Sequence, residues 1–224
     1  MTAAPAIGVL IVDDDPLVRA GLSMMLAEAD DIRIVAEVAD GTEVAGAVNE
    51  HRPDVVLMDI RMPRMDGLTA TERLRARREP PEIIILTTFD TDEHIVRALC
   101  AGASGFLLKH TPPAEILRAI RLVAAGEPML SPSVLRQVMS QVAQGAQAEA
   151  APRRTRAIQK LERLSEGERA VARLIGQGRT NSEISRELLV SVATVKAYVS
   201  RLLTKLELNN RVQVALLVHD AGEL

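Results

Sequence analysis

Two patterns of apolar and polar residues alternate along the first 125 positions of the chain. Short runs that are apolar throughout are each followed by a longer stretch with apolar residues at helical spacing. Such runs indicate strands buried on both faces, and the intervening helices allow these strands to pair in parallel. The pattern predicts five strand–helix pairs, at 7–12 and 16–28, 32–38 and 42–51, 54–58 and 67–77, 83–87 and 92–101, and 105–108 and 113–125. We therefore expect a doubly wound α/β fold with a five-stranded parallel sheet.

The remainder of the chain carries only helical patterns. A helix is indicated within Ser131–Ala143, and Gln144–Arg156 then lacks a period and is rich in Ala, Gln, Pro and Arg, as expected of a flexible linker. Further on, a capping box at Ser165-Glu166-Gly167-Glu168 predicts the start of a helix. Three more helices are predicted, capped in turn by Asn181, Ser191 and Asn210. The very short connection before the third of these four helices is typical of a helix-turn-helix.

These patterns divide the chain into an α/β domain at 1–126, a linker with a partial helix at 127–159, and a small all-α domain of four helices at 160–224. The charge is divided in the same way. Residues 1–151 hold 14 Lys and Arg against 22 Asp and Glu, a net of −8, whereas 152–224 hold 13 against 8, a net of +5. A basic C-terminal part favours an anionic partner such as nucleic acid, although a solvated surface is the simpler alternative.

The chain shows no sign of a membrane or secretory destination. No apolar run approaches the roughly 20 residues that cross a bilayer, and the N-terminus lacks the pattern of a signal peptide. The single cysteine, Cys100, cannot form an internal disulfide, and its place beside Leu99 on an apolar helix face predicts burial. We expect a cytoplasmic protein without membrane contact.

Polar residues with chemical potential stand at the carboxyl ends of the predicted strands. They are Asp13, Asp14, Asp59, Thr87 and Lys109. Because the carboxyl ends of parallel strands line one crevice, we expect these side chains to converge. Clustered carboxylates repel one another unless a hard cation such as Mg²⁺ binds them, and the whole set suits phosphoryl transfer to a carboxylate. An isolated Asp after a strand is more often a helix cap, so the prediction depends on the combination.

The same residues stand within longer motifs. The motifs are Val12-Asp13-Asp14, Asp59 followed by Met62-Pro63 and Asp66-Gly67, Leu86-Thr87-Thr88, and Leu108-Lys109. Together they resemble the receiver domain of two-component response regulators, which implies a flavodoxin-like fold. The resemblance implies that Asp59 is the phospho-acceptor and that Asp14, Asp59 and the backbone carbonyl of Arg61 bind Mg²⁺, with Asp13 acting through a water molecule. Thr87 and Lys109 would contact the phosphoryl group, and Phe106 would be the aromatic switch that follows Thr87.

Asp15 adds a third carboxylate directly after the first strand. It either strengthens the attraction for a metal ion or caps the first helix, and the sequence leaves both explanations open.

A second resemblance lies in the basic part of the chain. Its motifs are Leu164-Ser165-Glu166-Gly167-Glu168, Asn181-Ser182-Glu183-Ile184-Ser185, Val190-Ser191 and Thr194-Val195-Lys196. They resemble the DNA-binding domain of the NarL/FixJ (LuxR-type) class, which implies that helix 192–206 reads the major groove. The implied DNA contacts are Ser191, Thr194, Lys196, Ala197, Ser200 and Arg201. The final helix is rich in aliphatic residues, and its implied dimer contacts are Val212, Val214 and Leu217.

The two resemblances together imply a transcription regulator controlled by phosphorylation. A sensor histidine kinase would phosphorylate Asp59, and the protein would then form a homodimer on double-stranded DNA. No enzymatic activity is expected beyond its own phosphorylation and dephosphorylation. One alternative is a DNA-binding regulator that works without phosphorylation. Another is a metal-dependent phosphatase or phosphotransferase, but Asp59-Ile60-Arg61 lacks a second acid two residues after the nucleophile.

Overall fold

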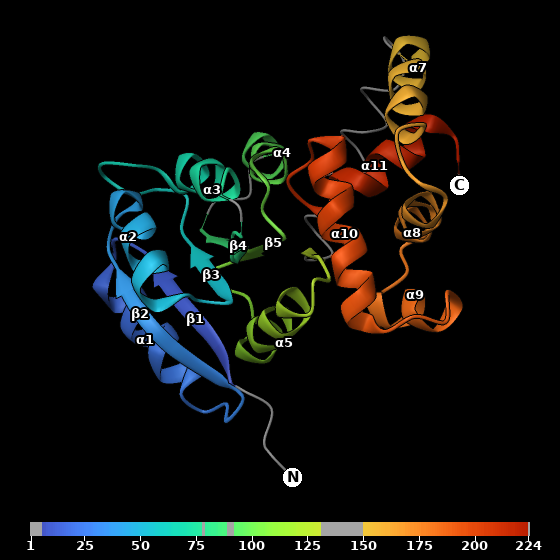
Figure 1. Ribbon diagram of the computed structural model, residues 1–224. Helices are drawn as coiled ribbons and strands as arrows, with labels where there is room; N and C mark the ends of the chain where they lie inside the picture. The colour runs from blue at the N-terminus through green and yellow to red at the C-terminus, as the bar shows by residue number, and fades with distance from the viewer. Residues whose placement is uncertain (1–5, 78, 89–91, 131–149, 224) are drawn as a thin grey trace.

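The computed structural model describes residues 6–77, 79–88, 92–130 and 150–223, which form an α/β domain followed by a helical domain (Figure 1). The predicted parallel sheet is confirmed, with the strand order β2-β1-β3-β4-β5-β6. Its strands are β1 (Ile7–Val12), β2 (Ile32–Val38), β3 (Val55–Met58), β4 (Glu82–Thr87), β5 (Gly105–Leu108) and β6 (Met129–Leu130). The sixth strand was not predicted, because two residues are too few to show a period.

Helices cover both faces of the sheet. They are α1 (Pro16–Leu26), α2 (Gly41–His51), α3 (Gly67–Arg75), α4 (Asp92–Ala101) and α5 (Pro113–Ala124). α1 and α5 pack on one face, whereas α2, α3 and α4 pack on the other. β1, β3 and β4 lie between neighbours on both sides and beneath helices on both faces, so their side chains, except for those of Ile7 and Glu82 at the strand starts, are buried whichever way they point. This double burial explains why these strands are continuous apolar runs.

The helical domain contains one helix more than predicted. Its helices are α7 (Ala150–Leu161), α8 (Glu166–Gly176), α9 (Asn181–Glu187), α10 (Val192–Leu206) and α11 (Arg211–Ala221). The linker prediction is wrong for the part that α7 occupies, because Ala157 and Leu161 of this helix are buried in the core of the helical domain. That domain therefore begins before residue 160. The helix predicted within 131–143 lies outside the described residues.

Polar side chains at the helix starts agree with the sequence at three of four predicted caps. The capping box is confirmed, since the Ser165 amide donates to Glu168 Oε2 at 2.9 Å and the Ser165 hydroxyl caps the helix in return. Ser191 and Asn210 also cap as predicted. α9 is different, because Thr180 is its N-cap and Asn181 is its first residue. Two adjacent residues with capping ability cannot be separated by pattern alone.

One partly buried ion pair gives the helical domain a pH-dependent stability. Lys205 Nζ lies 2.7 Å from Glu168 Oε2, and this hydrogen bond, followed by that of the Ser165 amide, lowers the pKa of Glu168 from 4.5 to about 2. Because the pKa is lower in the folded state, ionised Glu168 stabilises the fold at neutral pH. That contribution is lost as the pH falls from about 4.5 towards 2.

We therefore expect Lys205→Met to cost about 1–2 kcal/mol of stability at pH 7 and clearly less at pH 3. Tyr198 is the only tyrosine of a chain without tryptophan, so its fluorescence during urea unfolding reports on the helical domain. Arg173→Met is the matched control, because it removes an exposed pair with Glu223. Equal losses for Lys205→Met at both pH values would contradict the assignment.

Within the described ranges, no helix is both long enough and apolar enough to span a lipid bilayer.

Candidate functional site

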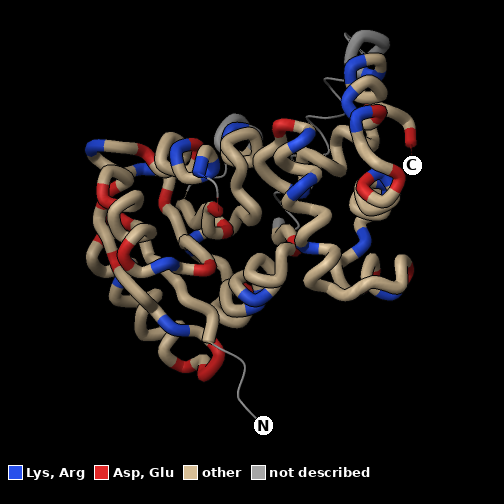
Figure 2. The backbone as a smooth tube through the Cα atoms, in the orientation of Figure 1, with Lys and Arg blue, Asp and Glu red and all other residues tan. Residues whose placement is uncertain are grey.

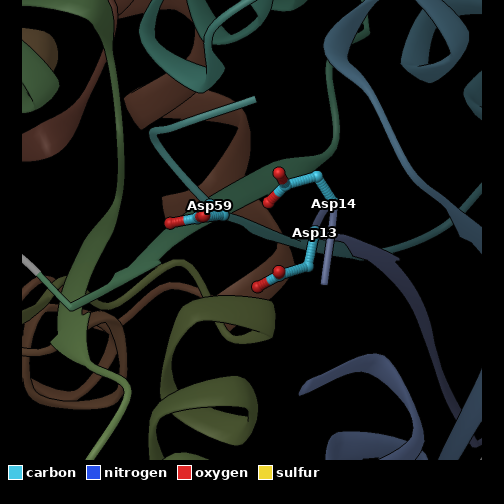
Figure 3. Close-up of side chains that lie close together, drawn as sticks. All are labelled: Asp13, Asp14 and Asp59. Carbon is cyan, nitrogen blue, oxygen red and sulfur yellow. The ribbon is translucent and has the colours of Figure 1, made fainter. Parts of the chain in front are cut away.

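Three carboxylates meet at the carboxyl edge of the sheet. Asp13 and Asp14 follow β1 and Asp59 follows β3, and these strands are neighbours with Val12 in register with Met58. Carboxylate oxygens of the three residues lie within 4.8 Å of one another, and Figure 3 shows the side chains next to each other where the two strands end. Asp13 and Asp59 are buried, whereas Asp14 is exposed. The structure thus brings together residues 45 positions apart (14 to 59), as the topology predicts.

The ammonium group of Lys109 lies between two of these carboxylates. Lys109 follows β5, and its Nζ lies 2.6 Å from Asp13 Oδ2 and 3.1 Å from Asp59 Oδ2. Three ionised carboxylates and one ammonium group leave a net charge of −2, which one divalent cation would balance. Mg²⁺ prefers carboxylate oxygens and tolerates partial exposure because it keeps several waters. The donor set therefore fits Mg²⁺, with exposed Asp14 on the side open to solvent.

Burial and charge shift the pKa values within this site. Burial raises the pKa of Asp59, and the negative charge of Asp13 adds to this rise while the Lys109 charge opposes it. Burial acts to lower the pKa of Lys109, but the hydrogen bonds to Asp13 and Asp59 and the charges of these two residues outweigh burial and raise that pKa. Lys109 is therefore positively charged at neutral pH. A cation that binds beside Asp59 would favour the ionised carboxylate, which is the nucleophilic form.

The loop after β3, residues 60–66, folds tightly over Asp59, the predicted phospho-acceptor, and is named the acceptor loop. The Ile60 amide donates to Asp59 Oδ1 at 2.8 Å, and the Gly67 amide donates to the Ile60 carbonyl at 2.8 Å. A Cβ atom at Gly67 would lie only 1.9 Å from the Asp59 carbonyl oxygen. Asp66 caps α3 through the Thr69 amide. Glycine is therefore required at position 67, where the loop returns to Asp59.

The other predicted residues of this site occupy the same edge of the sheet. Thr87 ends β4 and is buried, and Phe106 is buried in β5 opposite Ile85. Arg61 is exposed in the acceptor loop and shares with Asp14 a hollow of about 470 Å³. Their roles in phosphoryl binding, switching and metal binding stay predictions.

Asp15 is a helix cap. Its Oδ1 accepts a hydrogen bond from the Leu17 amide at 2.8 Å, and its own amide donates to Asp13 Oδ1 at 3.0 Å. Of the two roles that the sequence left open for Asp15, the structure thus shows the helix cap. The Asp15 amide also orients the Asp13 carboxylate.

The predicted DNA-contacting residues lie on α10 and at its N-cap. Figure 2 shows basic positions along α7 and α10. Thr194 is half-buried and shares a hydrogen-bonded cap with Ser191, whose hydroxyl lies 2.8 Å from that of Thr194. Arg201 lies over the Tyr198 ring, 4.7 Å from its centroid. The remaining predicted contacts are exposed; they are Lys196, Ala197 and Ser200.

Part of this face is turned towards the α/β domain. Lys196 Nζ donates to the carbonyl of Ala124, the last residue of α5, at 3.2 Å. Asn181 donates to the next carbonyl, that of Ala125, at 2.9 Å. Lys196 and Ser200 also line a cavity of about 610 Å³ between the two domains. In this arrangement of the domains, which we call closed, Lys196 would have to leave the Ala124 carbonyl before it could contact DNA.

A second contact joins the helical domain to the end of α4. Three side-chain amides at the start of α11, which we call the amide clamp, bind carbonyl oxygens there; they belong to Asn209, Asn210 and Gln213. Asn210 is only 3% exposed, and its Nδ2 donates to Leu99 at 2.8 Å and to Ala103 at 2.9 Å. The sequence predicted Asn210 only as a cap. No sequence signal separates the two uses, because its Oδ1 caps α11 while its Nδ2 binds the other domain.

Two further predictions need correction. Cys100 is exposed at the edge of this contact, not buried. Val214 is fully buried in the core of the helical domain, so its side chain is not available for the predicted dimer contact. Val212 packs against the core of the α/β domain, whereas Leu217 is half-buried beside the helical core. Helical spacing alone could not show which of these aliphatic residues point inwards.

Both parts of the chain match known families. Residues 9–121 match the response regulator receiver domain, and residues 162–218 match the bacterial regulatory proteins of the luxR family. Over 213 residues the chain is 37% identical to the transcriptional regulatory protein LiaR of Bacillus subtilis (strain 168), covering 95% of this chain and 97% of LiaR.

Solved structures agree with these matches. A crystal structure of the response regulator ChrA in a heme-sensing two-component system is 34% identical, with a TM-score of 0.53 over 99% of this chain and 100% of ChrA. RcsB, solved as two dimers bound to two parallel DNAs, shares the fold at 23% identity, with a TM-score of 0.55 over 96% of this chain and 98% of RcsB. The chain belongs to the two-component response regulators of the NarL/FixJ (LuxR-type) family, in which a receiver domain precedes a helix-turn-helix DNA-binding domain.

Proposed function

We propose that a sensor histidine kinase transfers a phosphoryl group to Asp59, and that phosphorylation releases the helical domain to bind double-stranded DNA as a homodimer and regulate transcription. The observation that carries this proposal is the position of the Lys109 ammonium group between the carboxylates of Asp13 and Asp59. A nucleophile, a cation and a divalent-metal donor set stand together at one edge of the sheet. The helical domain matches a family of bacterial regulatory proteins, and bacterial DNA lies in the cytoplasm, so this is the compartment that we propose.

Each residue of the site has a chemical task in this proposal. A carboxylate oxygen of Asp59 forms a bond to phosphorus, while the bond from phosphorus to the donor histidine nitrogen breaks and its electron pair stays on that nitrogen. The ammonium of Lys109, 3.1 Å from Asp59 Oδ2, lies close enough to pair with the incoming phosphoryl oxygens. Asp14, Asp59 and the Arg61 carbonyl would hold Mg²⁺, with Asp13 acting through water. When bound, Mg²⁺ neutralises negative charge on the phosphoryl oxygens.

The signal has a short physical route to the helical domain. Thr87 would donate to the phosphoryl group and Phe106 would follow it. α4 lies between these two residues along the chain, directly after β4. The last turn of α4 carries the Leu99 carbonyl that the amide clamp binds. Moving a two-state equilibrium from mostly closed to mostly open takes about 5 kcal/mol, which corresponds to a few hydrogen bonds of about 1 kcal/mol each. Loss of the hydrogen bonds of the amide clamp and of the one from Lys196 to Ala124 is therefore large enough to shift the domains from the closed to the open arrangement.

Dimerisation is supported by the fold and by the composition of the last helix. RcsB, which shares this fold, has been solved as dimers on DNA. In the closed arrangement Val212 packs against the receiver core, so opening would expose an aliphatic side chain on the helix that also carries Leu217. We propose these two residues, without Val214, as the dimer contact.

The test is the intact mass and solution size of the protein after incubation with acetyl phosphate and Mg²⁺. We expect wild type to gain one phosphoryl group and to dimerise, and both changes to disappear with a chelator or in Asp59→Asn. Asp54→Asn is the matched control, because Asp54 stands at the opposite end of β3 and should not affect phosphorylation. If wild type gained no phosphoryl group, the proposal would fail in favour of a regulator that works without phosphorylation. A phosphorylated monomer would refute the dimerisation step alone.

A further inference from the structure

Asp40 is a buried carboxylate outside the acidic site, at the corner between β2 and α2. It is 1% exposed and acts as the N-cap of α2. Its Oδ1 accepts hydrogen bonds from the Thr42 amide at 2.9 Å and the Thr42 hydroxyl at 2.7 Å. Its Oδ2 accepts from the Arg64 amide, 2.9 Å away and 24 positions later in the acceptor loop. One carboxylate thus joins the start of a helix to the loop that follows the acceptor.

The next residue brings the same two segments into backbone contact. A Cβ atom at Gly41 would lie 2.5 Å from the Met65 carbonyl oxygen, so a larger residue would push the loop away. The Ile60 carbonyl accepts from the Gly67 amide. This hydrogen bond ties the first residue of the acceptor loop to the residue that directly follows the loop. The Arg61 carbonyl therefore stands between two fixed points, Ile60 and Arg64. Its position depends on both.

The attachment at Arg64 uses the loop backbone more than the arginine side chain. Burial acts to raise the pKa of Asp40, but hydrogen bonds from Thr42 and from the amides of Arg64 and Met65 outweigh it and hold the pKa far below its usual value. The carboxylate is therefore ionised and accepts from amides at any working pH. The Arg64 guanidinium is largely exposed, with its Nε 3.4 Å from Asp40 Oδ1, and it also pairs with Glu43. Removing that side chain should leave the amide contact in place.

We propose that Asp40 is a positioning residue for the phosphorylation site, which fixes the acceptor loop so that the Arg61 carbonyl and Asp59 present their oxygens to Mg²⁺ together. Asp40 touches none of the reacting atoms and acts only through the loop. The inference rests on the proposed function, because a phosphorylation site gives this role its purpose. The binding of Mg²⁺ can nevertheless be measured without phosphorylation. Groups that orient metal ligands typically change metal affinity by about 10- to 100-fold when they are removed.

Asp40→Asn is the informative substitution. Asparagine is as good an N-cap as aspartate, so its oxygen can keep the bonds to Thr42 and preserve α2. Its amide nitrogen would replace Oδ2 and cannot accept from the Arg64 amide, so the loop loses its attachment. We expect the Mg²⁺ concentration for half-saturation to rise about tenfold and the phosphorylation rate at saturating Mg²⁺ to change less than about twofold.

The experiment uses the full chain and has two readouts. Calorimetric titration with Mg²⁺ measures affinity directly, and intact mass during incubation with acetyl phosphate measures the rate at several Mg²⁺ concentrations. Arg64→Ala and Thr42→Val are matched controls, since both change groups around Asp40 and keep the Arg64 amide. Both should bind Mg²⁺ like wild type.

The two proposals fail in different ways. Unchanged Mg²⁺ affinity in Asp40→Asn would overturn the positioning role, as would a loss of rate at saturating Mg²⁺ without a shift in half-saturation, which indicates general damage to the fold. Absence of Mg²⁺ binding in wild type would also overturn it. If wild type bound Mg²⁺ but gained no phosphoryl group, the proposed function would fail while the calorimetric comparison still decided the role of Asp40.

Discussion

Asn210→Asp is expected to raise the affinity of the unphosphorylated protein for duplex DNA by about 10- to 100-fold. The substitution keeps an oxygen that can accept from the Gln213 amide, as Asn210 Oδ1 does at 2.9 Å, so the start of α11 stays capped. It removes the amide that donates to the carbonyls of Leu99 and Ala103. The effect is therefore confined to the contact between the domains.

The size of this effect follows from burial. Asn210 is 3% exposed, so the aspartate would place a carboxylate oxygen against two carbonyl oxygens that have lost their donor. Losing two hydrogen bonds and leaving buried acceptors unpaired costs about 2–4 kcal/mol in the closed arrangement. The open arrangement carries none of this cost. Because apparent affinity scales with the fraction of competent protein, opening raises it until most molecules are open.

Fluorescence anisotropy with a labelled duplex at fixed salt measures the affinity, and small-angle X-ray scattering measures the accompanying increase in the radius of gyration. Asn209→Asp is the matched control, because it adds the same charge at an exposed neighbour whose contact with the Cys100 carbonyl, at 3.5 Å, is the longest and weakest in the amide clamp. It should bind DNA slightly more weakly than wild type through charge alone. If Asn210→Asp bound no more tightly than this control, the amide clamp would have no part in restraining the helical domain.

Gly67→Ala is expected to destabilise the receiver domain by about 3 kcal/mol and to displace Asp59. The added Cβ atom would lie 1.9 Å from the Asp59 carbonyl oxygen and 2.9 Å from the Asp59 carbonyl carbon, and a backbone cannot move aside as a side chain can. Either α3 moves outwards or the peptide after Asp59 rotates. Both responses disturb the bond from the Ile60 amide to Asp59 Oδ1.

Urea unfolding followed by far-UV circular dichroism would show this loss, and phosphorylation by acetyl phosphate should slow in parallel. Gly21→Ala provides the control, since Gly21 is exposed in the middle of α1 and an added methyl group there would meet only open space. That change should stabilise the helix by about 0.5–1 kcal/mol. Tyr198 fluorescence should change little in either variant, because it reports on the helical domain. Wild-type stability in Gly67→Ala would contradict the close approach.

The sheet and its acidic edge were predictable because they follow from local patterns and one topological rule. β1, β3 and β4 are buried on both faces, so their apolar runs are unambiguous. The rule that ligands bind at the carboxyl ends of parallel strands then brings Asp13 and Asp59 together without further knowledge. These steps require only residues close in sequence and the order of the strands.

What the sequence did not show depends on contacts between distant segments. The sequence predicts a linker over part of α7, because the composition of this helix is polar and only a narrow face, with Ala157 and Leu161, is buried. Val214 and Val212 are both aliphatic residues of one helix, yet one faces its own core and the other faces the receiver. Asp40 has the ordinary appearance of a cap, and its bond to Arg64 depends on a loop 24 positions away.

The hydrogen bonds that Asn181, Asn210 and Gln213 donate to the receiver all end on backbone carbonyl oxygens, as does the one from the charged Lys196. A carbonyl carries no net charge, so dissolved ions screen these contacts only weakly. Contacts with DNA phosphates are different, because added salt reduces the free energy gained when counterions are released from the DNA. Ionic strength therefore acts on one side of the competition for Lys196: concentrated salt leaves this side chain with the receiver, whereas dilute salt favours its transfer to DNA, at any level of phosphorylation.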